Sequence, residues 1–430
     1  MQPKPDRRTF LAGIGAAGAA LATMGATSPT TRPHSKNNDG IVVGMIGTGG
    51  RGTELAGSYA GMSDVIVHTV CDVDATHAKN GADAAERKQG TRPKIVDDLR
   101  HVLDDPAIQA VVVATPDHWH APAAILACEA GKHVYVEKPC CHNPQEGQWL
   151  VETARKHNRV VQQGTQRRSW PGNREAIERV LAGDIGKVYL SRGWYNNNRP
   201  ITGKRTPASV PPGLNWDLWQ GPAPRCDFTD NVVPYKWHWY WNWGTGEIGN
   251  NGIHALDLCR WGLGVDYPRK VTAGGGRYHF HDDQQTPDTL SVTYNFGDKA
   301  IFWEGRSCNP VGFEDMGFGI EFYGDKATLI VDGGGYRIND LKGKLLHKQT
   351  GVANNEVHIQ NFIDCIRSGE RPNADIEIGF KSTLLCHLGN IAYRTGGVVN
   401  CDPATGQILG HPAARALWGR TYEPQWKPKV

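Results

Sequence analysis

Two polar residues that could take part in chemistry, Thr115 and Lys138, stand at the ends of apolar runs within residues 111–139, VVVATPDHWHAPAAILACEAGKHVYVEKP. An Ala-rich helical pattern joins the two runs, which predicts two buried parallel strands with a helical crossover. Ligands of such sheets bind at the carboxyl ends of the strands. A lysine at such an end is suited to contact bound chemistry, although a surface salt bridge would also account for it.

A glycine-rich turn follows the apolar run that begins at residue 41, in the segment IVVGMIGTGGRG. Gly47, Gly49 and Gly52 have the GxGxxG spacing, with a predicted strand before them and the helical pattern TELAGSYAGM after them. Glycines at these positions permit a tight turn and let backbone N–H groups approach a pyrophosphate at the N-terminus of the helix. The pattern predicts a dinucleotide site.

An aspartate completes this pattern at the end of the next predicted strand, VIVHTVCDVD, where Asp72 lies twenty positions after Gly52. A carboxylate there can accept hydrogen bonds from both ribose hydroxyls of the adenosine half and would repel a 2′-phosphate. The sequence therefore favours NAD over NADP as the cofactor. A structural turn with a helix-capping aspartate is the alternative interpretation.

Four tryptophans alternate with other residues in the segment 236–261, KWHWYWNWGTGEIGNNGIHALDLCRW. A strand over this part would place Trp237, Trp239, Trp241 and Trp243 on one face. Such a face would be either a packed aromatic core or a wall on which a sugar ring stacks, and the sequence leaves both interpretations open.

The helices and strands predicted around these residues indicate an α/β protein with two domains. The 430-residue chain has room for both and for a sizeable core. Residues 40–165 are predicted to form a Rossmann domain with a doubly wound parallel sheet. Residues 166–430 would form a C-terminal α/β domain, with a large open, mainly antiparallel sheet followed by helices near 357–368 and 377–395. The net charge of +3 indicates neither a nucleic-acid partner nor a strongly acidic ligand.

Residues 1–39 are predicted to be a twin-arginine signal peptide and a polar linker. Arg7 and Arg8 precede a mild Ala/Gly-rich run that is too short and too weakly apolar to span a membrane permanently. We therefore expect an exported, periplasmic protein with no membrane span after removal of the signal. A disordered tail is the alternative.

No metal site is expected from the ten cysteines, most of which stand singly in apolar patterns where cysteine acts as a small hydrophobe. Cys140 and Cys141 are adjacent, which suits neither a relaxed disulfide nor tetrahedral zinc. A second group of possible metal ligands consists of His279, His281, Asp282 and Asp283. We interpret these residues as part of a strand that runs into a polar turn.

With these motifs in hand, the chain resembles the Gfo/Idh/MocA family, the relatives of glucose–fructose oxidoreductase and inositol dehydrogenase. The glycine turn, TPDHWHA, VEKP and GNNGIHALD occur in the family's order, and the resemblance covers roughly residues 40–425. WDLWQGPAP and HIQNFIDCIRSGERPNADIEIG also look like exported members. The resemblance implies a nucleotide across the cleft, substrate over its nicotinamide, and association through the open sheet as a homo-oligomer, a dimer or tetramer.

The resemblance also implies roles for individual residues. His254 matches the usual proton-transfer histidine, and Asn250 stands where many family dehydrogenases have an aspartate, so these two positions do not supply a carboxylate–histidine pair. The cofactor-binding residues implied are Gly47, Gly49, Gly52, Asp72, Thr115, Pro116, His120, Glu137 and Lys138. Further candidates for contacts with substrate are Arg167, Trp239 and Trp241.

Oxidation of a carbinol fits these residue types, because it needs a hydride acceptor and a base for the hydroxyl proton. A neutral imidazole at His254 is suited to act as the base near neutral pH, although a satisfied buried histidine is the alternative. An ammonium at Lys138 would stabilise the developing alkoxide, an effect of about 10²–10³ in rate. Asn250 can bind substrate through hydrogen bonds but cannot take a proton.

Three functions follow from the sequence. The first is an NAD-dependent oxidoreductase that transfers a hydride between a sugar, glycoside or polyol and a tightly bound nicotinamide cofactor. The second is a redox-neutral glycoside hydrolase that works by oxidation, elimination, hydration and reduction on one retained NAD; Asn250 and the scarcity of free NAD outside the cytoplasm favour it. The third is a non-catalytic nucleotide-binding sugar sensor, against which the presence of both Lys138 and His254 argues. The first is the principal hypothesis.

Overall fold

The computed structural model describes residues 40–430. The predicted twin-arginine signal and linker, residues 1–39, lie outside the described residues. Within the described part, no helix combines the length and the apolar character that a transmembrane span requires.

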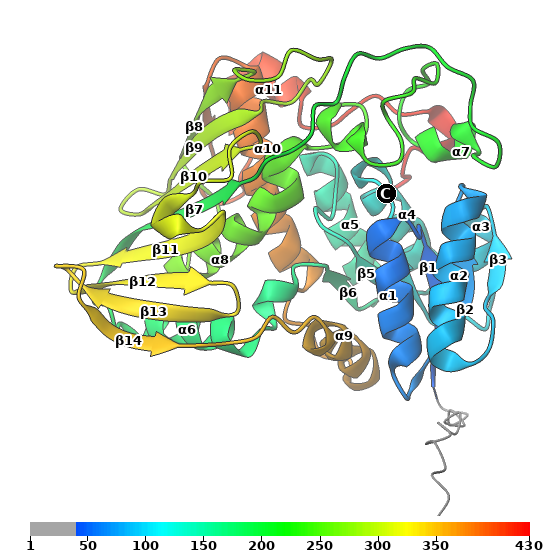
Figure 1. Cartoon of the computed structure of the whole chain (residues 1–430), viewed down its shortest axis with the longest axis horizontal. Coiled ribbons are helices and arrows are strands. Elements are labelled where there is room, and N and C mark those ends of the chain that lie inside the picture. Colours follow the sequence, from blue (N-terminus) through cyan, green and yellow to red (C-terminus); the bar gives the residue numbers. More distant parts are fainter. Residues whose placement is uncertain (1–39) are drawn as a thin grey trace, which may run out of the picture. The chain divides into compact units, whose positions relative to one another are not determined.

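A six-stranded parallel sheet forms the N-terminal portion of this part, in the order β3-β2-β1-β4-β5-β6 (Figure 1). Its central strands are apolar and buried because helices cover both faces. The chain reverses its strand order between β1 and β4, which is where such sheets bind ligands. The strands are β1 (Ile41–Ile46), β2 (Val65–Cys71), β3 (Lys94–Val96), β4 (Ala110–Val113), β5 (His133–Val136) and β6 (Val161–Gln163).

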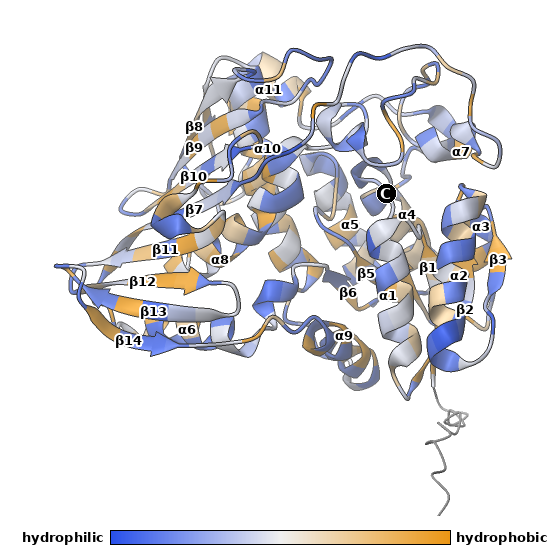
Figure 2. Ribbon diagram, in the orientation of Figure 1, coloured by the Kyte–Doolittle hydropathy of each residue, from blue (hydrophilic) through white to orange (hydrophobic). Residues whose placement is uncertain are grey.

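Helices on the two faces of this sheet pack into different hydrophobic clusters. The strand residues Val43 and Met45 pack with Leu55 and Tyr59 of α1, and α9 returns from the far end of the chain to cover this side with Phe362. Helix α2 carries many hydrophilic residues (Figure 2), and its buried positions are alanines and one glycine. The helices are α1 (Gly50–Gly61), α2 (Ala75–Gln89), α3 (Arg100–Leu103), α4 (Asp117–Glu129), α5 (Pro144–Lys156) and α9 (Glu356–Ser368).

A ten-stranded sheet forms the second half, in the order β14-β13-β12-β11-β7-β10-β9-β8-β15-β16. All its neighbouring strands are antiparallel except the parallel pair β7 and β10. The strands are β7 (Val188–Asn196), β8 (Lys270–Gly276), β9 (Thr289–Asn295), β10 (Ala300–Arg306), β11 (Phe318–Gly324), β12 (Ala327–Asp332), β13 (Gly335–Asp340), β14 (Leu345–Gln349), β15 (Val398–Cys401) and β16 (Ile408–Leu409).

Burial alternates along strands such as β9 and β10, so that one face of this sheet packs on helices and the other is more accessible. Helix α10 packs on β8 and also on α5, which brings the second sheet beside the first half of the chain (Figure 1). The α/β class with a parallel Rossmann sheet and a mainly antiparallel second sheet is confirmed. The covering helices are α6 (Pro171–Ala182), α8 (Ile253–Leu263) and α10 (Ile376–Arg394).

The strand considered for the alternating tryptophans does not form. Residues Lys236–Trp239 form the 3₁₀ helix η2, in which Tyr240 N–H bonds to the Trp237 carbonyl at 3.2 Å, and a turn follows in which Trp243 N–H bonds to the Tyr240 carbonyl at 3.0 Å. The indoles therefore enter different surroundings. Trp237 and Trp243 are buried in an aromatic cluster, whereas Trp239 and Trp241 lie beside arginines 199 and 394, with ring centroid to guanidinium distances of 5.5 and 4.7 Å.

Helices near 357–368 and 377–395 are confirmed by α9 and α10. Helix α3 is a single turn that begins at Arg100. The remaining elements are α7 (Trp216–Gln220), α11 (Pro412–Ala416), η1 (Gln166–Arg168), η4 (Phe313–Asp315) and η5 (Pro424–Trp426). All ten cysteines lie in the described part, and none of them forms a disulfide there.

Candidate active site

A cavity of about 600 Å³ lies at the carboxyl ends of the parallel strands. Residues from β1, β2, β4 and β5 or the loops after them form one wall, and a segment that follows β7 forms the opposite one. The predicted site residues that line it are Gly47, Gly49, Asp72, Thr115, Pro116, His120, Glu137, Lys138 and Asn250.

The glycine turn has the shape that a pyrophosphate needs. Gly47 has φ +84°, and a Cβ there would come within 2.7 Å of the Thr115 backbone nitrogen. A Cβ on Gly52 would overlap the Gly47 carbonyl, so this position holds the turn against α1. A Cβ on Gly49 would meet nothing within 4 Å, which leaves open space before the N-terminus of α1 for a phosphate to approach the backbone.

Asp72 is held at the end of β2, with its side chain 9% exposed. Its carboxylate accepts hydrogen bonds from the N–H groups of Thr48 at 2.6 Å and Asp74 at 2.9 Å. Burial raises the pKa of Asp72, and these two hydrogen bonds oppose the rise. Asp97 and Asp98 line the same end of the cavity. These two carboxylates were not predicted from the sequence, although an adjacent acidic pair just after β3 could have indicated them. With Asp72 they place negative charge at this end of the cavity, which disfavours a 2′-phosphate.

The loop after β4 carries Thr115, Pro116 and His120. Pro116 precedes the first turn of α4, and the Thr115 hydroxyl is buried without a hydrogen-bond partner within residues 40–430. His120 contacts the carbonyl oxygens of Pro139 at 2.6 Å and Thr115 at 2.8 Å through its two ring nitrogens. His120 therefore joins the loop after β4 to the turn after β5, and the Thr115 hydroxyl remains available to a bound nicotinamide.

Glu137 contacts neighbouring side chains of the protein in this structure. Its side chain is buried and accepts from Arg51 Nε at 2.8 Å, while Arg51 also pairs with Glu54 at 2.9 Å. Burial alone would raise the pKa of Glu137, but the charges of Arg51 and Lys138 prevail and hold it below its ordinary value. Glu137 therefore stays a carboxylate beside the first turn of α1.

Lys138 reaches across from β5 to the start of the α8 region. Its Nζ donates to the Asn250 carbonyl at 2.6 Å and to Asn250 Oδ1 at 2.9 Å. Asn250 lies in the π-helical turn η3 (Ile248–Gly252), and such turns are frequent at functional sites. Burial lowers the pKa of Lys138, whereas the charges of Glu137, Asp117 and Glu247 oppose this. The uncharged amide of Asn250 therefore holds Nζ by hydrogen bonds and adds no negative charge beside it.

His254 lies in the first turn of α8, four positions after Asn250. Its Nδ1 is buried and has no hydrogen-bond partner in the described part of the chain. Burial, followed by the positive charges of Lys138 and Arg167, lowers the pKa of His254 well below its usual value. The imidazole is therefore neutral near pH 7 and can accept a proton. Its side chain lies outside the cavity wall itself.

The three candidate substrate contacts lie apart from the cavity wall. Arg167 donates to the Gly333 carbonyl at 3.1 Å, and its guanidinium lies 4.0 Å from the Phe318 ring centroid. Arg167 is linked to the site through its effect on the pKa of His254, and the ring of Trp239 lies 5.8 Å from that of His238, which lines the cavity. The roles of Arg167, Trp239 and Trp241 stay predictions.

Other residues that line the cavity were missed in the sequence reasoning. Asp117, in the first turn of α4, is buried and accepts from Thr245 Oγ1 at 2.6 Å; burial raises its pKa. Tyr235 is half exposed, and its hydroxyl accepts from Arg199 at 3.0 Å. His238 is buried beside it, and burial lowers its pKa to about 3. The aromatic run in the sequence could have indicated Tyr235 and His238 as site residues. A strand over this run, however, does not show which of its side chains face the cavity.

The residues present fit a bound dinucleotide, with a glycine cradle, an acidic ribose end and an unpartnered hydroxyl at the opposite end. No group of three or more metal-binding side chains gathers in the part of the chain that the structure describes. The arrangement can therefore bind a nucleotide and set a lysine and a neutral histidine near its reactive end.

Comparison with known proteins agrees with this geometry. A curated levoglucosan dehydrogenase from Pseudarthrobacter phenanthrenivorans is 28% identical over 227 residues, which cover 52% of this chain and 51% of that protein. A glycosyl hydrolase family 109 protein from Shewanella putrefaciens is 30% identical over 169 residues, 35% of this chain and 37% of that protein. The chain thus spans about half the length, or less, of these curated relatives.

Solved structures show the same fold. A levoglucosan dehydrogenase in complex with NADH and levoglucosan has a TM-score of 0.66 at 18% identity, and the match covers 84% of this chain and 99% of that one. One family model, an oxidoreductase NAD-binding Rossmann fold, matches residues 41–165, and its companion, an oxidoreductase C-terminal α/β domain, matches residues 188–428. With a dinucleotide groove of this geometry and both models matched, the chain belongs to the Gfo/Idh/MocA oxidoreductase family.

Proposed function

We propose that the protein is an NAD-dependent oxidoreductase that transfers a hydride between a sugar, glycoside or polyol and its nicotinamide cofactor. The observation that carries this proposal is the contact of Lys138 with Asn250 at one end of a groove that begins at the glycine turn. The levoglucosan dehydrogenase relative, named for an anhydrosugar substrate, supports a carbohydrate class.

Each residue has a part that follows from its chemistry. Gly47, Gly49 and Asp72 would hold the cofactor, which supplies a hydride acceptor when it is bound. The Lys138 ammonium would stabilise negative charge on the substrate oxygen as it develops. His254, kept neutral by its surroundings, would accept the hydroxyl proton. Asn250 holds Lys138 in place without neutralising its charge.

A second candidate is a redox-neutral glycoside hydrolase. It is favoured by Asn250, which departs from the aspartate of many dehydrogenases of the family, and by a relative named for glycosyl hydrolase family 109. In this reaction a ring carbinol is oxidised, the neighbouring C–H loses its proton, the aglycone leaves, water adds, and the ring is reduced again. The product keeps the oxidation level of the substrate.

The deciding experiment is incubation of the folded protein with a panel of glycosides, anhydrosugars and free sugars in deuterated water. Parallel samples receive NAD or no nucleotide, and products are identified by mass spectrometry. An oxidised sugar without cleavage, lost in Lys138→Ala, would support the oxidoreductase. A cleaved aglycone with deuterium on a ring carbon would replace that proposal with the hydrolase.

A sugar sensor is the outcome if the panel binds but no product forms. In that case neither the unaltered protein nor Lys138→Ala would show turnover. Sugar binding is measured on the same samples by calorimetry, so that a failed assay is separated from a protein that binds without reacting.

We propose further that the protein is exported by the twin-arginine route and acts in the periplasm as a homo-oligomer. The sequence of residues 1–39 supports the first point, and the family's association through the open sheet supports the second. Cell fractionation with Arg7→Lys/Arg8→Lys as the variant tests export: the protein would stay in the cytoplasm. Light scattering of the mature chain tests association, and a monomeric mass would refute it.

A further inference from the structure

Arg167 is a partly buried arginine at the carboxyl ends of the parallel strands. It lies in η1 after β6, much as Lys138 follows the neighbouring strand β5. Its guanidinium is 4.6 Å from the ring centroid of Trp170 and 4.0 Å from that of Phe318 on β11. Its Nη1 donates to the Gly333 carbonyl at 3.1 Å. The side chain is thus held between an aromatic ring close to it in the chain and one from the ten-stranded sheet.

The next residue in the chain fixes the position of Arg167 relative to His254. Arg168 Nε donates to the two carboxylate oxygens of Asp257 at 2.9 and 2.8 Å. Asp257 lies on α8 three positions after His254, so the two side chains leave the helix on the same side. The charge of Arg167 reaches His254, whose pKa it helps to lower. Arg167 therefore lies near the proposed base, and like that base it lies outside the cavity wall.

Arg167 has no carboxylate partner within residues 40–430, and its one hydrogen bond there is the one to the Gly333 carbonyl. Burial lowers the pKa of Arg167 to about 10, and no carboxylate charge opposes that effect. The guanidinium is still charged at neutral pH, because even this lowered pKa lies well above 7. Buried charges are normally paired, since an unpaired ion loses its hydration without compensation. The charge and most of the five N–H groups of Arg167 are therefore available to an anion from outside the chain.

Carboxylates around the proposed base are engaged by other groups. Three of them pair with other arginines, and a further one, Asp117, accepts from Thr245 Oγ1 at 2.6 Å. None of these carboxylates is paired with Arg167. The three pairs are Arg51–Glu137 at 2.8 Å, Arg168–Asp257 at 2.8 Å and Arg199–Glu247 at 3.1 Å.

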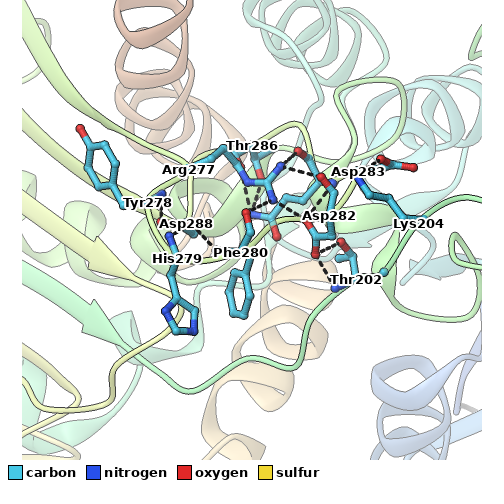
Figure 3. A network of polar contacts seen from close by, with 12 residues as sticks. Thr202, Lys204, Arg277, Tyr278, His279, Phe280, Asp282, Asp283, Thr286 and Asp288 are labelled. Atoms are coloured by element: carbon cyan, nitrogen blue, oxygen red, sulfur yellow. Dashed lines mark hydrogen bonds and ion pairs between the residues drawn. The ribbon is translucent and has the colours of Figure 1, made fainter.

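The polar turn between β8 and β9 shows the same pairing away from the site (Figure 3). Arg277 pairs with Asp282, and both Asp282 and Asp283 accept from backbone N–H groups of the segment after β7. These two members of the group of possible metal ligands therefore serve as an internal anchor. Arg167 differs from Arg277 in that its charge has no such partner in the described part of the chain.

Two buried donors close to Arg167 in the chain also lack an acceptor. Thr165 is 1% exposed, and its hydroxyl has no hydrogen-bond partner among the described residues. The same holds for the indole Nε1 of Trp170, which is 5% exposed and whose ring lies against the guanidinium. Hydrogen bonds from an arginine to an anion are charge-assisted and stronger than neutral ones. This stretch of the chain therefore offers donors without matching acceptors, as an anion site does.

We propose that Arg167 binds a carboxylate of the substrate, so that the protein acts on acidic sugars, uronates or aldonates, in preference to neutral ones. The inference rests on the proposed function and names the class of its substrate. A carboxylate suits a guanidinium because the two groups form paired, parallel hydrogen bonds. Its single charge also matches the single unpaired charge of Arg167, whereas a phosphate monoester carries about −1.5 to −2. Binding of the carboxylate would orient the sugar so that a carbinol reaches His254 and Lys138.

The first test uses the unaltered protein with NAD and matched sugars. Glucuronate, galacturonate and gluconate are each compared with the neutral sugar or sugar alcohol of the same configuration, with their own methyl esters, and with the corresponding phosphate and sulfate esters. We expect a lower KM for the acid, and a kcat/KM about 10–100-fold above that of the neutral sugar and of the methyl ester. Equal kcat/KM for the acids and their esters would overturn the inference. A preference for the phosphate or the sulfate would overturn the choice of a carboxylate.

The second test compares variants of two arginines that both lie over a phenylalanine ring. Arg192, the control, is 4.7 Å from the Phe313 ring centroid, and it lies on the face of β7 opposite to Gly193, which faces α8. In Arg167→Gln we expect the ratio of kcat/KM for acid and neutral sugar to fall by about tenfold or more. Arg167→Lys should keep part of the ratio, and Arg192→Gln should keep all of it. An unchanged ratio in Arg167→Gln would refute the role of Arg167.

Two measures keep these outcomes interpretable. If Arg167→Gln does not fold, judged by circular dichroism, the comparison of each acid with its methyl ester on the unaltered protein decides alone. Calorimetry with the same acids separates binding from turnover. A chain that binds the acids more tightly than their esters but forms no product would refute the proposed function and leave the acid site intact. Oxidation of neutral sugars without a preference for acids would do the reverse, and a chain that binds none of the acids would refute the inference.

Discussion

Asn250 decides how much charge Lys138 can offer to a substrate. An aspartate at this position would neutralise the ammonium 2.9 Å away, whereas the amide only orients it. Burial already lowers the pKa of Lys138, so its charged form depends on Glu137, Asp117 and Glu247. The pH range in which the lysine is charged should therefore be sensitive to this one residue.

Asn250→Asp tests that dependence. A carboxylate beside Nζ favours the ammonium and raises the pKa of Lys138, so the basic limb of the pH–kcat profile is expected to move upward by about one unit. The profile is measured with the sugar that the panel identifies, and Asn354→Asp, at an exposed position before α9, is the control. A basic limb that stays in place or moves downward would contradict a charged lysine in the reaction.

Asp72 is expected to set the preference for NAD. Its carboxylate would lie nearest a 2′-phosphate, with Asp97 and Asp98 in the same part of the cavity wall. In Asp72→Asn, loss of one charge should reduce the ratio of the dissociation constants for NADP and NAD by about tenfold. Calorimetry with the nucleotide-free chain measures both constants. Asp64→Asn, on the surface, serves as the control, and an unchanged ratio in Asp72→Asn would remove this role from Asp72.

At the scale of elements, the position of His254 depends on how closely α8 approaches the ten-stranded sheet. Gly193 of β7 faces this helix, and a Cβ there would come 2.8 Å from the Ala255 Cβ. The backbone of β7 at Gly193 therefore packs directly against the methyl group of Ala255 at the start of α8. The position of Ala255, next to the proposed base, is thus set by a glycine 62 positions earlier in the chain.

Gly193→Ala should push α8 away from β7. We expect a loss of about 1–3 kcal/mol in the free energy of unfolding, because an extra methyl is forced into a packed interface. Turnover should fall as well, since His254 moves with the helix. The control is Gly274→Ala on β8, where a Cβ would meet nothing within 4 Å and the change should stay within about 0.5 kcal/mol. Urea unfolding measures both; equal stabilities would contradict the tight approach.

At the scale of the whole molecule, several buried histidines make stability depend on pH. Burial lowers the pKa of His118 and His238 to about 3, and that of His358 and His387 to about 4. The unfolded chain takes up a proton at each of these near pH 6.5, while the folded chain does so only near pH 3–4. The unfolded state therefore binds more protons in between, and stability falls as the pH falls through this window.

We expect the free energy of unfolding to decrease from pH 7 to pH 5.5 by about 1 kcal/mol for each of these histidines. Urea unfolding at the two pH values measures the decrease. In His387→Gln the decrease should be smaller by that amount, whatever the variant does to stability at pH 7. A chain more stable at pH 5.5 than at pH 7 would show that these histidines are not held neutral.

The sequence by itself determined which residues stand at the ends of the parallel strands. The glycine turn, Asp72, Thr115 and Lys138 could be placed at one edge because each follows its strand directly, and the carboxyl ends of parallel strands share that edge. The α/β class followed from the same short-range periodicity. The two helices near the end of the chain were likewise visible in local patterns.

Only the tertiary structure decided which distant segments meet these residues. Lys138 and Asn250 are 112 positions apart, and Trp119 and the Leu218 carbonyl are 99 apart, so no local spacing relates them. The tryptophans alternate like a strand, yet a 3₁₀ helix and turns form there, and Trp237 and Trp243 pack in one cluster with Trp219 from an earlier segment. The strand ends follow from hydrogen bonding and periodicity along the chain. The wall above them depends on long-range packing, which is decided only when the whole chain has folded.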